Sequence, residues 1–127
     1  MFIEYFPDGS DDCPLILMHG CEPDAIFGLC DRVVALAAER IQGVAVHELP
    51  GFESVNSCRL FLQTGNSDNG TYALSEAESF ECRLRPASWD TFQWKLRPFT
   101  IPLSNNHFQY LDNHGDIQLL VSGHRGW

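Results

Sequence analysis

Residues 23–41 read PDAIFGLCDRVVALAAERI, and their apolar positions recur with the period of an α-helix. The residues that share one face are Ile26, Leu29, Cys30, Val33, Ala37 and Ile41. Pro23 suits a first helical turn, and the acidic Glu22 and Asp24 complement the positive end of the helix dipole. Gly43 supplies a stop signal. We therefore expect one main helix over about 24–41.

The segment before this helix has the pattern of strands. Residues 15–18 form a continuous apolar run, which is typical of a strand covered on both faces. Residues 1–6 predict a shorter extended segment, and the Pro-Asp-Gly that follows at 7–9 predicts a turn.

The second half of the chain has mostly strand patterns. Strands are expected at 44–49, 58–64 and 80–84, and a hairpin at 108–111 and 117–121. A short helix is expected over about 88–97, with Trp89, Phe92 and Leu96 on one face. Together these patterns predict an α+β fold in one domain spanning 1–127, in which one main helix (about 24–41) and one short helix (about 88–97) pack on a mostly antiparallel sheet.

Charge is the most distinctive compositional feature of the chain. Residues 1–31 hold seven carboxylates and neither Lys nor Arg, and the whole chain has 17 acids against 8 bases, for a formal charge of −9. Such a surface repels nucleic-acid phosphates and anionic membranes but attracts basic proteins. We therefore expect a basic protein partner and neither a nucleic-acid nor a membrane ligand.

The cysteine content predicts a cytoplasmic protein with reduced thiols. The five cysteines are odd in number and widely spread, unlike the dense pattern of a disulfide scaffold, and the first residues lack the pattern of a secretory signal. A homodimer is an alternative if one apolar face of the sheet lacks a covering helix.

Metal and cofactor motifs are weak. His19 and Cys21 are two nearby soft ligands, but no paired Cys-x₂₋₄-Cys or His-x₃₋₅-His spacing accompanies them. The acids between Asp8 and Asp12 lack the pattern of an EF-hand loop. We therefore expect no metal and no cofactor.

Two functional hypotheses follow from the sequence. The first is a small acidic interaction protein of the inhibitor or immunity type, similar in size and charge to proteins that neutralise basic nucleic-acid-cleaving toxins. The partner-binding residues expected for it are Asp8, Asp11, Asp12, Glu22, Asp24 and, as the exposed aromatic side chain, Trp94. A competing interpretation is that the acidity only keeps the protein soluble.

The second hypothesis is a small enzyme or ligand-binding domain. Its pocket would lie near His19, Cys21 and His47, which are expected close to strand ends, a common place for chemistry. No catalytic motif selects particular residues, so the first hypothesis is preferred.

Overall fold

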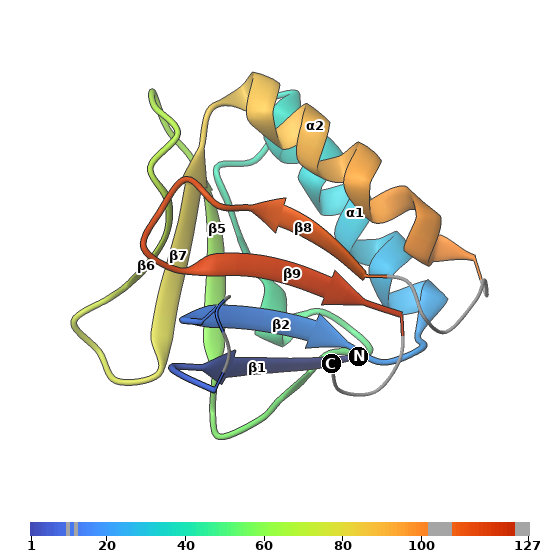
Figure 1. The fold of residues 1–127 in the computed structure, drawn as a ribbon. Helices are drawn as coiled ribbons and strands as arrows, with labels where there is room; N and C mark the ends of the chain where they lie inside the picture. The colour runs from blue at the N-terminus through green and yellow to red at the C-terminus, as the bar shows by residue number, and fades with distance from the viewer. Residues whose placement is uncertain (10, 12, 102–107, 124–127) are drawn as a thin grey trace.

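The computed structural model describes residues 1–9, 11, 13–101 and 108–123, and it has an α+β fold in which two helices pack on two β-sheets (Figure 1). The first sheet contains, in spatial order, β4 (Glu53–Ser54), β1 (Phe2–Phe6), β2 (Leu15–His19), β9 (Gln118–Ser122) and β8 (Phe108–Asp112). The second contains β3 (Gly43–Ala45), β5 (Arg59–Thr64), β7 (Ser79–Leu84) and β6 (Gly70–Ala73). The helices are α1 (Pro23–Ala37) and α2 (Pro86–Leu96), and the 3₁₀ turns are η1 (Val46–Glu48) and η2 (Arg97–Thr100). The predicted fold class is confirmed.

The strand pairing is mixed in both sheets. Within the described chain, four strand pairs are antiparallel, and three, β1–β4, β2–β9 and β5–β7, are parallel. The sequence predicted one sheet and no strand at 70–73. The second sheet arises because β5 and β7 run parallel, while β6 between them in sequence folds back to pair antiparallel with β7.

Both helices differ from their expected bounds. The prediction that α1 continues to 41 is wrong, because Glu39 has a left-handed φ of 58° and ends the helix at Ala37. The amide of Arg40 donates to the carbonyl of Ala35 at 2.9 Å, which closes the last turn as a Schellman motif. The second helix, α2, begins two residues early, because Pro86 occupies its first turn.

The expected strand at 44–49 is shorter than predicted. It ends at Ala45, and the chain turns into η1. The amide of Leu60 donates to Nδ1 of His47 at 3.1 Å. The His47 side chain therefore takes the place of a backbone partner for β5 where β3 ends.

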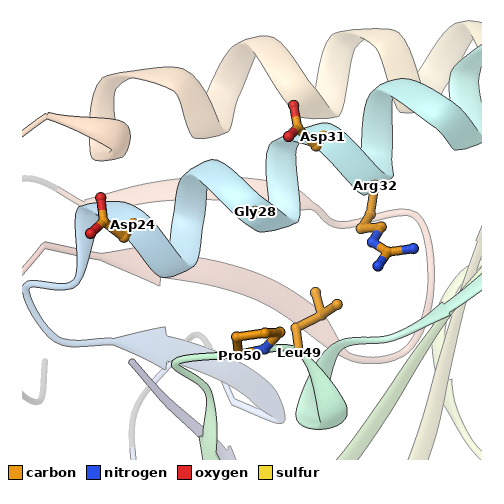
Figure 2. Close-up of a pocket in the computed structure, with 6 residues that line it drawn as sticks. All are labelled: Asp24, Gly28, Asp31, Arg32, Leu49 and Pro50. Carbon is orange, nitrogen blue, oxygen red and sulfur yellow. The ribbon is translucent and has the colours of Figure 1, made fainter.

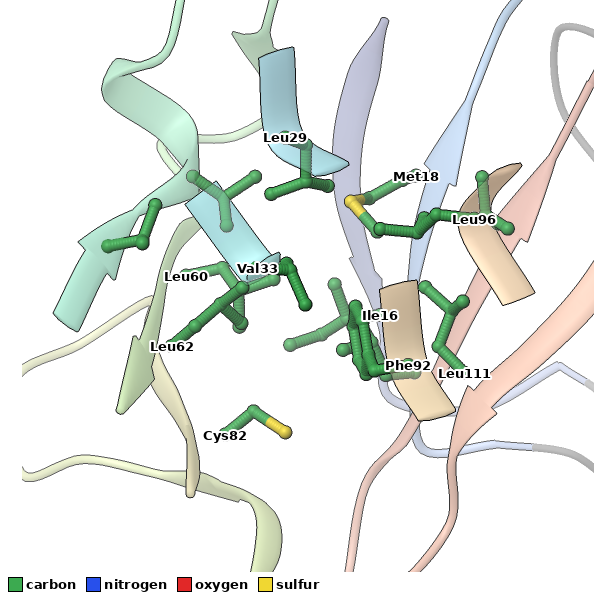
Figure 3. Packing of buried hydrophobic residues seen from close by; sticks show 14 of the residues in the cluster. Ile16, Met18, Leu29, Val33, Leu60, Leu62, Cys82, Phe92, Leu96 and Leu111 are labelled. Carbon is green, nitrogen blue, oxygen red and sulfur yellow. The ribbon is translucent and has the colours of Figure 1, made fainter. Parts of the chain in front are cut away.

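The main core lies between the helices and both sheets (Figure 3). Buried side chains from α1, α2, β2 and β5 point into this interior, and they include Leu29, Val33, Phe92, Ile16 and Leu60. The apolar faces predicted for both helices are confirmed by the burial of Ile26, Leu29 and Val33 in α1 and of Trp89, Phe92 and Leu96 in α2.

A smaller cluster lies on the opposite face of the first sheet. Leu15, Leu17 and Leu120 are fully buried there within the single chain. These three side chains are therefore shielded from solvent within one chain. Neither α1 nor α2 has the length and apolar character needed to cross a bilayer, and no other helix among the described residues does.

Candidate functional site

The outward side of the helical layer carries two exposed aromatic side chains. The helices α1 and α2 run antiparallel and side by side (Figure 1), and Cys30 Sγ on α1 lies 3.9 Å from the carbonyl oxygen of Gln93 on α2. Phe27, one turn before Cys30, is 57% exposed, and Trp94, which follows Gln93, is 62% exposed. Because the buried faces of both helices point to the core, these aromatic rings face solvent on the same layer.

Trp94 is held in a defined orientation. The Arg97 guanidinium lies over its ring, 4.7 Å from the centroid, and Arg97 Nε donates to Oε1 of Gln93 at 2.6 Å. A side chain that is already ordered loses less conformational entropy when it binds a partner. Phe27 was not predicted to be an exposed aromatic residue, although its position beside Ile26 and outside the apolar stripe was a usable signal.

The structure divides the predicted acidic residues between two places. Asp8 and Asp11 lie at the turn between β1 and β2, whereas Glu22 and Asp24 lie where α1 begins. The two pairs stand at opposite ends of β2, whose five residues span about 17 Å. Asp12 lies outside the described residues. A partner that contacts α1 and Trp94 therefore meets Glu22 and Asp24 rather than the whole acidic segment.

Ion pairs are concentrated around the second sheet. Among the described residues, three ion pairs contain arginine: Arg59–Glu76 at 3.2 Å, Arg83–Glu81 at 3.3 Å and Arg85–Asp68 at 2.9 Å. In the N-terminal 31 residues, only Glu4 forms an ion pair among the acids that the structure describes, and its partner is His19. The acids without one are Asp8, Asp11, Glu22, Asp24 and Asp31. Acids without an ion pair also occur elsewhere among the described residues: Glu39, Glu48, Glu53, Glu78, Asp90 and Asp116. The unneutralised negative charge is therefore spread over the described surface, and α1 and the β1–β2 turn carry part of it.

A cleft of about 260 Å³ runs between α1 and the loop after η1 (Figure 2). Its lining residues are Asp24, Gly28, Asp31, Arg32, Leu49 and Pro50. In Figure 2, Asp24 and Asp31 lie along α1 on either side of Gly28, and Arg32 reaches toward Leu49. Glycine inside a helix costs about 1 kcal/mol relative to alanine, yet a Cβ on Gly28 would meet no atom within 4 Å.

His19, Cys21 and His47 have different environments. His19 is only 6% exposed, its Nε2 lies 3.1 Å from Glu4 Oε1, and its ring stacks on Phe2. Cys21 is exposed at the start of the helical segment, whereas His47 is bound to the backbone of β5 in the second sheet. The two histidines therefore have their observed partners in different sheets.

A second polar cluster, which the sequence did not predict, lies at the end of β8. The Asp112 side chain is 1% exposed and its Oδ1 lies 2.5 Å from Nδ1 of His114, whose side chain is 51% exposed. The pair lines a cleft of about 110 Å³ between α2 and β8, together with Ser88, Thr91 and Lys95. Residues 113–116 predict only a hairpin turn, so nothing in the sequence pattern separated this carboxylate from an ordinary turn aspartate.

The five cysteines, all among the described residues, form no disulfide bond and differ greatly in exposure. Burial raises the pKa of Cys30 to about 11 and that of Cys58 to about 12, and it also raises the pKa of Cys82. These three thiols stay protonated at neutral pH. Of the other two, Cys21 is exposed and Cys13 is half-buried. No group of three or more His, Cys, Asp or Glu residues in the described part of the chain is arranged to hold a metal ion.

Comparison with known proteins identifies no relative: neither a family model, nor a curated protein, nor a solved structure matches this chain.

Proposed function

We propose that this protein binds a basic protein partner through the outward side of α1 and α2. We call this surface the helical face and define it by Phe27, Trp94, Glu22, Asp24 and Asp31. The observation that carries the proposal is the exposure of two large aromatic side chains, 57% and 62%, beside carboxylates that form no ion pair within the described residues.

Aromatic and acidic side chains contribute differently to such binding. Covering the exposed part of Phe27 or Trp94 removes roughly 100–150 Å² of surface from water, which is worth about 2–4 kcal/mol for each ring. The carboxylates contribute mainly to the rate and selectivity of association, because they attract a positively charged surface over a distance. Arg97 lies over Trp94, so the carboxylates that would attract a basic partner are those at and along α1, near Phe27. Aromatic anchors on a surface that includes these acids favour a partner that is both basic and partly apolar.

The type of partner follows from this chemistry. Basic enzymes that act on nucleic acid carry a positive surface that complements the helical face, so an inhibitor or immunity-type role is the form of the proposal we prefer. Five cysteines without a disulfide bond agree with a partner met in the reducing cytoplasm.

The test exposes the immobilised protein to a lysate of its source cells, elutes the bound proteins with a salt gradient and identifies them by mass spectrometry. The baits are the wild type, Trp94→Ala, the double variant Asp24→Lys/Asp31→Lys, and the control Asp116→Lys in the β8–β9 turn. We expect a basic protein to bind the wild type and the control and to be lost from the other two baits. Retention of the same proteins by all four baits would contradict the proposal.

A second candidate function is a small-ligand or catalytic site. The sequence hypothesis assigned it to His19, Cys21 and His47, but the arrangement that favours it best is the Asp112–His114 pair, because a buried carboxylate orients a half-exposed imidazole in a cleft. The test follows the His114 ring resonances by NMR during addition of inorganic phosphate. Saturable shifts that Lys95→Gln abolishes would support this candidate, and unchanged resonances would remove it.

A further inference from the structure

We infer that the cleft over Gly28 is a groove for one arginine or lysine side chain. The inference rests on the proposed function for the source of that side chain, which is the basic partner. The chemistry of the groove itself can be tested without the partner.

Gly28 has no role in the fold that explains why it is glycine. Gly51, on the opposite side of the cleft, is a useful contrast: its φ is +86°, and a Cβ there would lie 2.8 Å from Cβ of Ala25. Backbone conformation and close packing therefore both require glycine at 51. Gly28 is helical, and a Cβ there would enter open space. A glycine that weakens its helix and packs against nothing is best explained by a need to keep that space empty.

The wall opposite Gly28 is fixed in place. The tight contact of Gly51 with Ala25 holds the loop against α1. Within the loop, the Leu49 amide donates to the carbonyl of Val46 at 3.1 Å, and the Phe52 amide donates to the carbonyl of Leu49 at 3.2 Å. The cleft is therefore formed before any ligand arrives, which lowers the entropic cost of binding.

The lining of the cleft matches a long cationic side chain. Asp24 and Asp31 are two helical turns apart, about 10 Å along the axis, with Gly28 between them (Figure 2). Leu49 and Pro50 offer an apolar wall for a methylene stem. With two acids and one base, Arg32, the lining has a net charge of −1.

The size of the cleft also favours a single side chain. Its volume of about 260 Å³ is below the roughly 300–1,000 Å³ of pockets that enclose drug-sized ligands. The cleft borders the helical face, because Phe27 precedes Gly28 in the same turn of α1. A partner can therefore cover Phe27 and insert one cationic residue beside it.

The experiment titrates ¹⁵N-labelled protein with N-acetyl-arginine amide and, in parallel, with the neutral N-acetyl-citrulline amide. We expect saturable shifts of the Gly28 and Leu49 amides with the arginine compound and at least about tenfold weaker binding of the citrulline compound. Asp24→Asn should weaken binding about two- to fivefold, the range for an exposed charge pair. Gly28→Gln should abolish the response, whereas Ala87→Gln on the exposed side of α2 should leave it unchanged.

The Gly28 variants carry their own folding control. Gly28→Ala and Gly28→Gln should each raise the melting temperature by about 3 °C, because both residues favour the helix more than glycine does. Loss of arginine binding in a more stable protein separates a blocked groove from a damaged fold. Equal binding of citrulline, wild-type binding by Gly28→Gln, or no shift at all would overturn the inference.

The two proposals fail independently. If the arginine compound binds over Gly28 but no basic protein depends on Trp94 and the α1 acids, the groove is retained and the proposed function is refuted. If such a protein is captured but the arginine compound produces no shift, the proposed function is retained and the groove is refuted.

Discussion

Glu39 closes α1 with a left-handed backbone, at φ 58°, and replacing it with glycine should stabilise the protein. A residue with a Cβ is destabilised by roughly 1–2 kcal/mol in this conformation. Glycine avoids this strain, but its greater conformational freedom in the unfolded chain offsets roughly 0.5–1 kcal/mol of the gain. The capping bonds from Glu39 to Leu36 and from Arg40 to Ala35 involve only the backbone and are kept. Removing a negative charge from the helix C-terminus adds a few tenths of a kcal/mol. We expect a net gain of about 1 kcal/mol.

Urea unfolding and thermal melting measure this gain. Glu39→Gly should raise the urea midpoint with an unchanged slope, and it should raise the melting temperature by about 3 °C for a domain of this size. Glu39→Ala removes the charge but keeps the strained backbone, so it should remain close to the wild type. Arg32 offers the opposite control within the same helix: Arg32→Gly should be about 1 kcal/mol less stable than Arg32→Ala.

The difference in stability between the two variants at position 39 shows whether the left-handed backbone strains the wild type. If Glu39→Gly is no more stable than Glu39→Ala, the left-handed conformation does not strain the wild type, and the explanation for the early end of α1 is incorrect.

Three further predictions concern pH, thiol reactivity and the junction of the two sheets. Burial alone would raise the pKa of Asp68, but backbone and side-chain hydrogen bonds from Arg85 lower it to about 2 from 3.8. The contribution of the Asp68 carboxylate to the free energy of unfolding is therefore complete above about pH 4 and lost as the pH falls toward 2. In urea unfolding, Asp68→Asn should lower the free energy of unfolding by about 1 kcal/mol or less at pH 7. The variant should also lose less stability than the wild type over this acidic range. In Ellman's assay at pH 8, Cys21→Ser should remove the fastest thiol phase of the folded protein, because Cys21 is exposed; persistence of that phase would assign it to another cysteine. Gly115→Ala should destabilise the protein by about 3 kcal/mol or more in urea unfolding, because the new Cβ would lie 2.3 Å from the carbonyl oxygen of Thr71. If this variant is as stable as the wild type, the backbone contact between the two sheets is loose.

Local patterns predicted the elements whose signal is contained in a few neighbouring residues. The uninterrupted apolar run at 15–18 gave a strand that is buried on both faces, as expected. The alternation of Phe80, Cys82 and Leu84 likewise marked the buried side of β7. The end of α1 was missed because apolar spacing continues to Ile41, while the conformation that stops the helix belongs to Glu39, a residue type without a stop signal.

Strand partners could not be read from such patterns. Alternation identifies the buried face of a strand but not the neighbour beside which the strand lies. The parallel pairing of β5 with β7 and of β2 with β9 joins segments that are distant in sequence, and each pairing depends on the packing of the rest of the chain. The strand β6 was missed because its four residues, Gly70–Ala73, are too few for a periodic signal.

The same limit applies to the candidate site. The exposure expected for Trp94 followed from its place outside the Trp89, Phe92 and Leu96 face, which is a local property. The separation of Asp8 from Asp24 by the length of β2, and the cleft formed where the loop at Leu49 meets α1, depend on tertiary packing. The sequence therefore indicated which side chains are available but not which of them share a surface.

The distribution of charge bears on whether the acidity serves more than solubility. If solubility were its only role, the positions of the unpaired acids would be of little consequence, because net charge alone keeps proteins apart. In this protein Asp68, Glu76 and Glu81 are paired with arginines around the second sheet. Asp24 and Asp31 on α1 form no ion pair within the described residues, and they line the cleft that contains Gly28. A binding role predicts that the acids on α1 act differently from unpaired acids elsewhere in the described chain, such as Glu53, Glu78 and Asp116. Neutralising the α1 acids should therefore slow association with a basic partner more than neutralising the same number of acids elsewhere, and equal effects would return the acidity to a purely solubilising role.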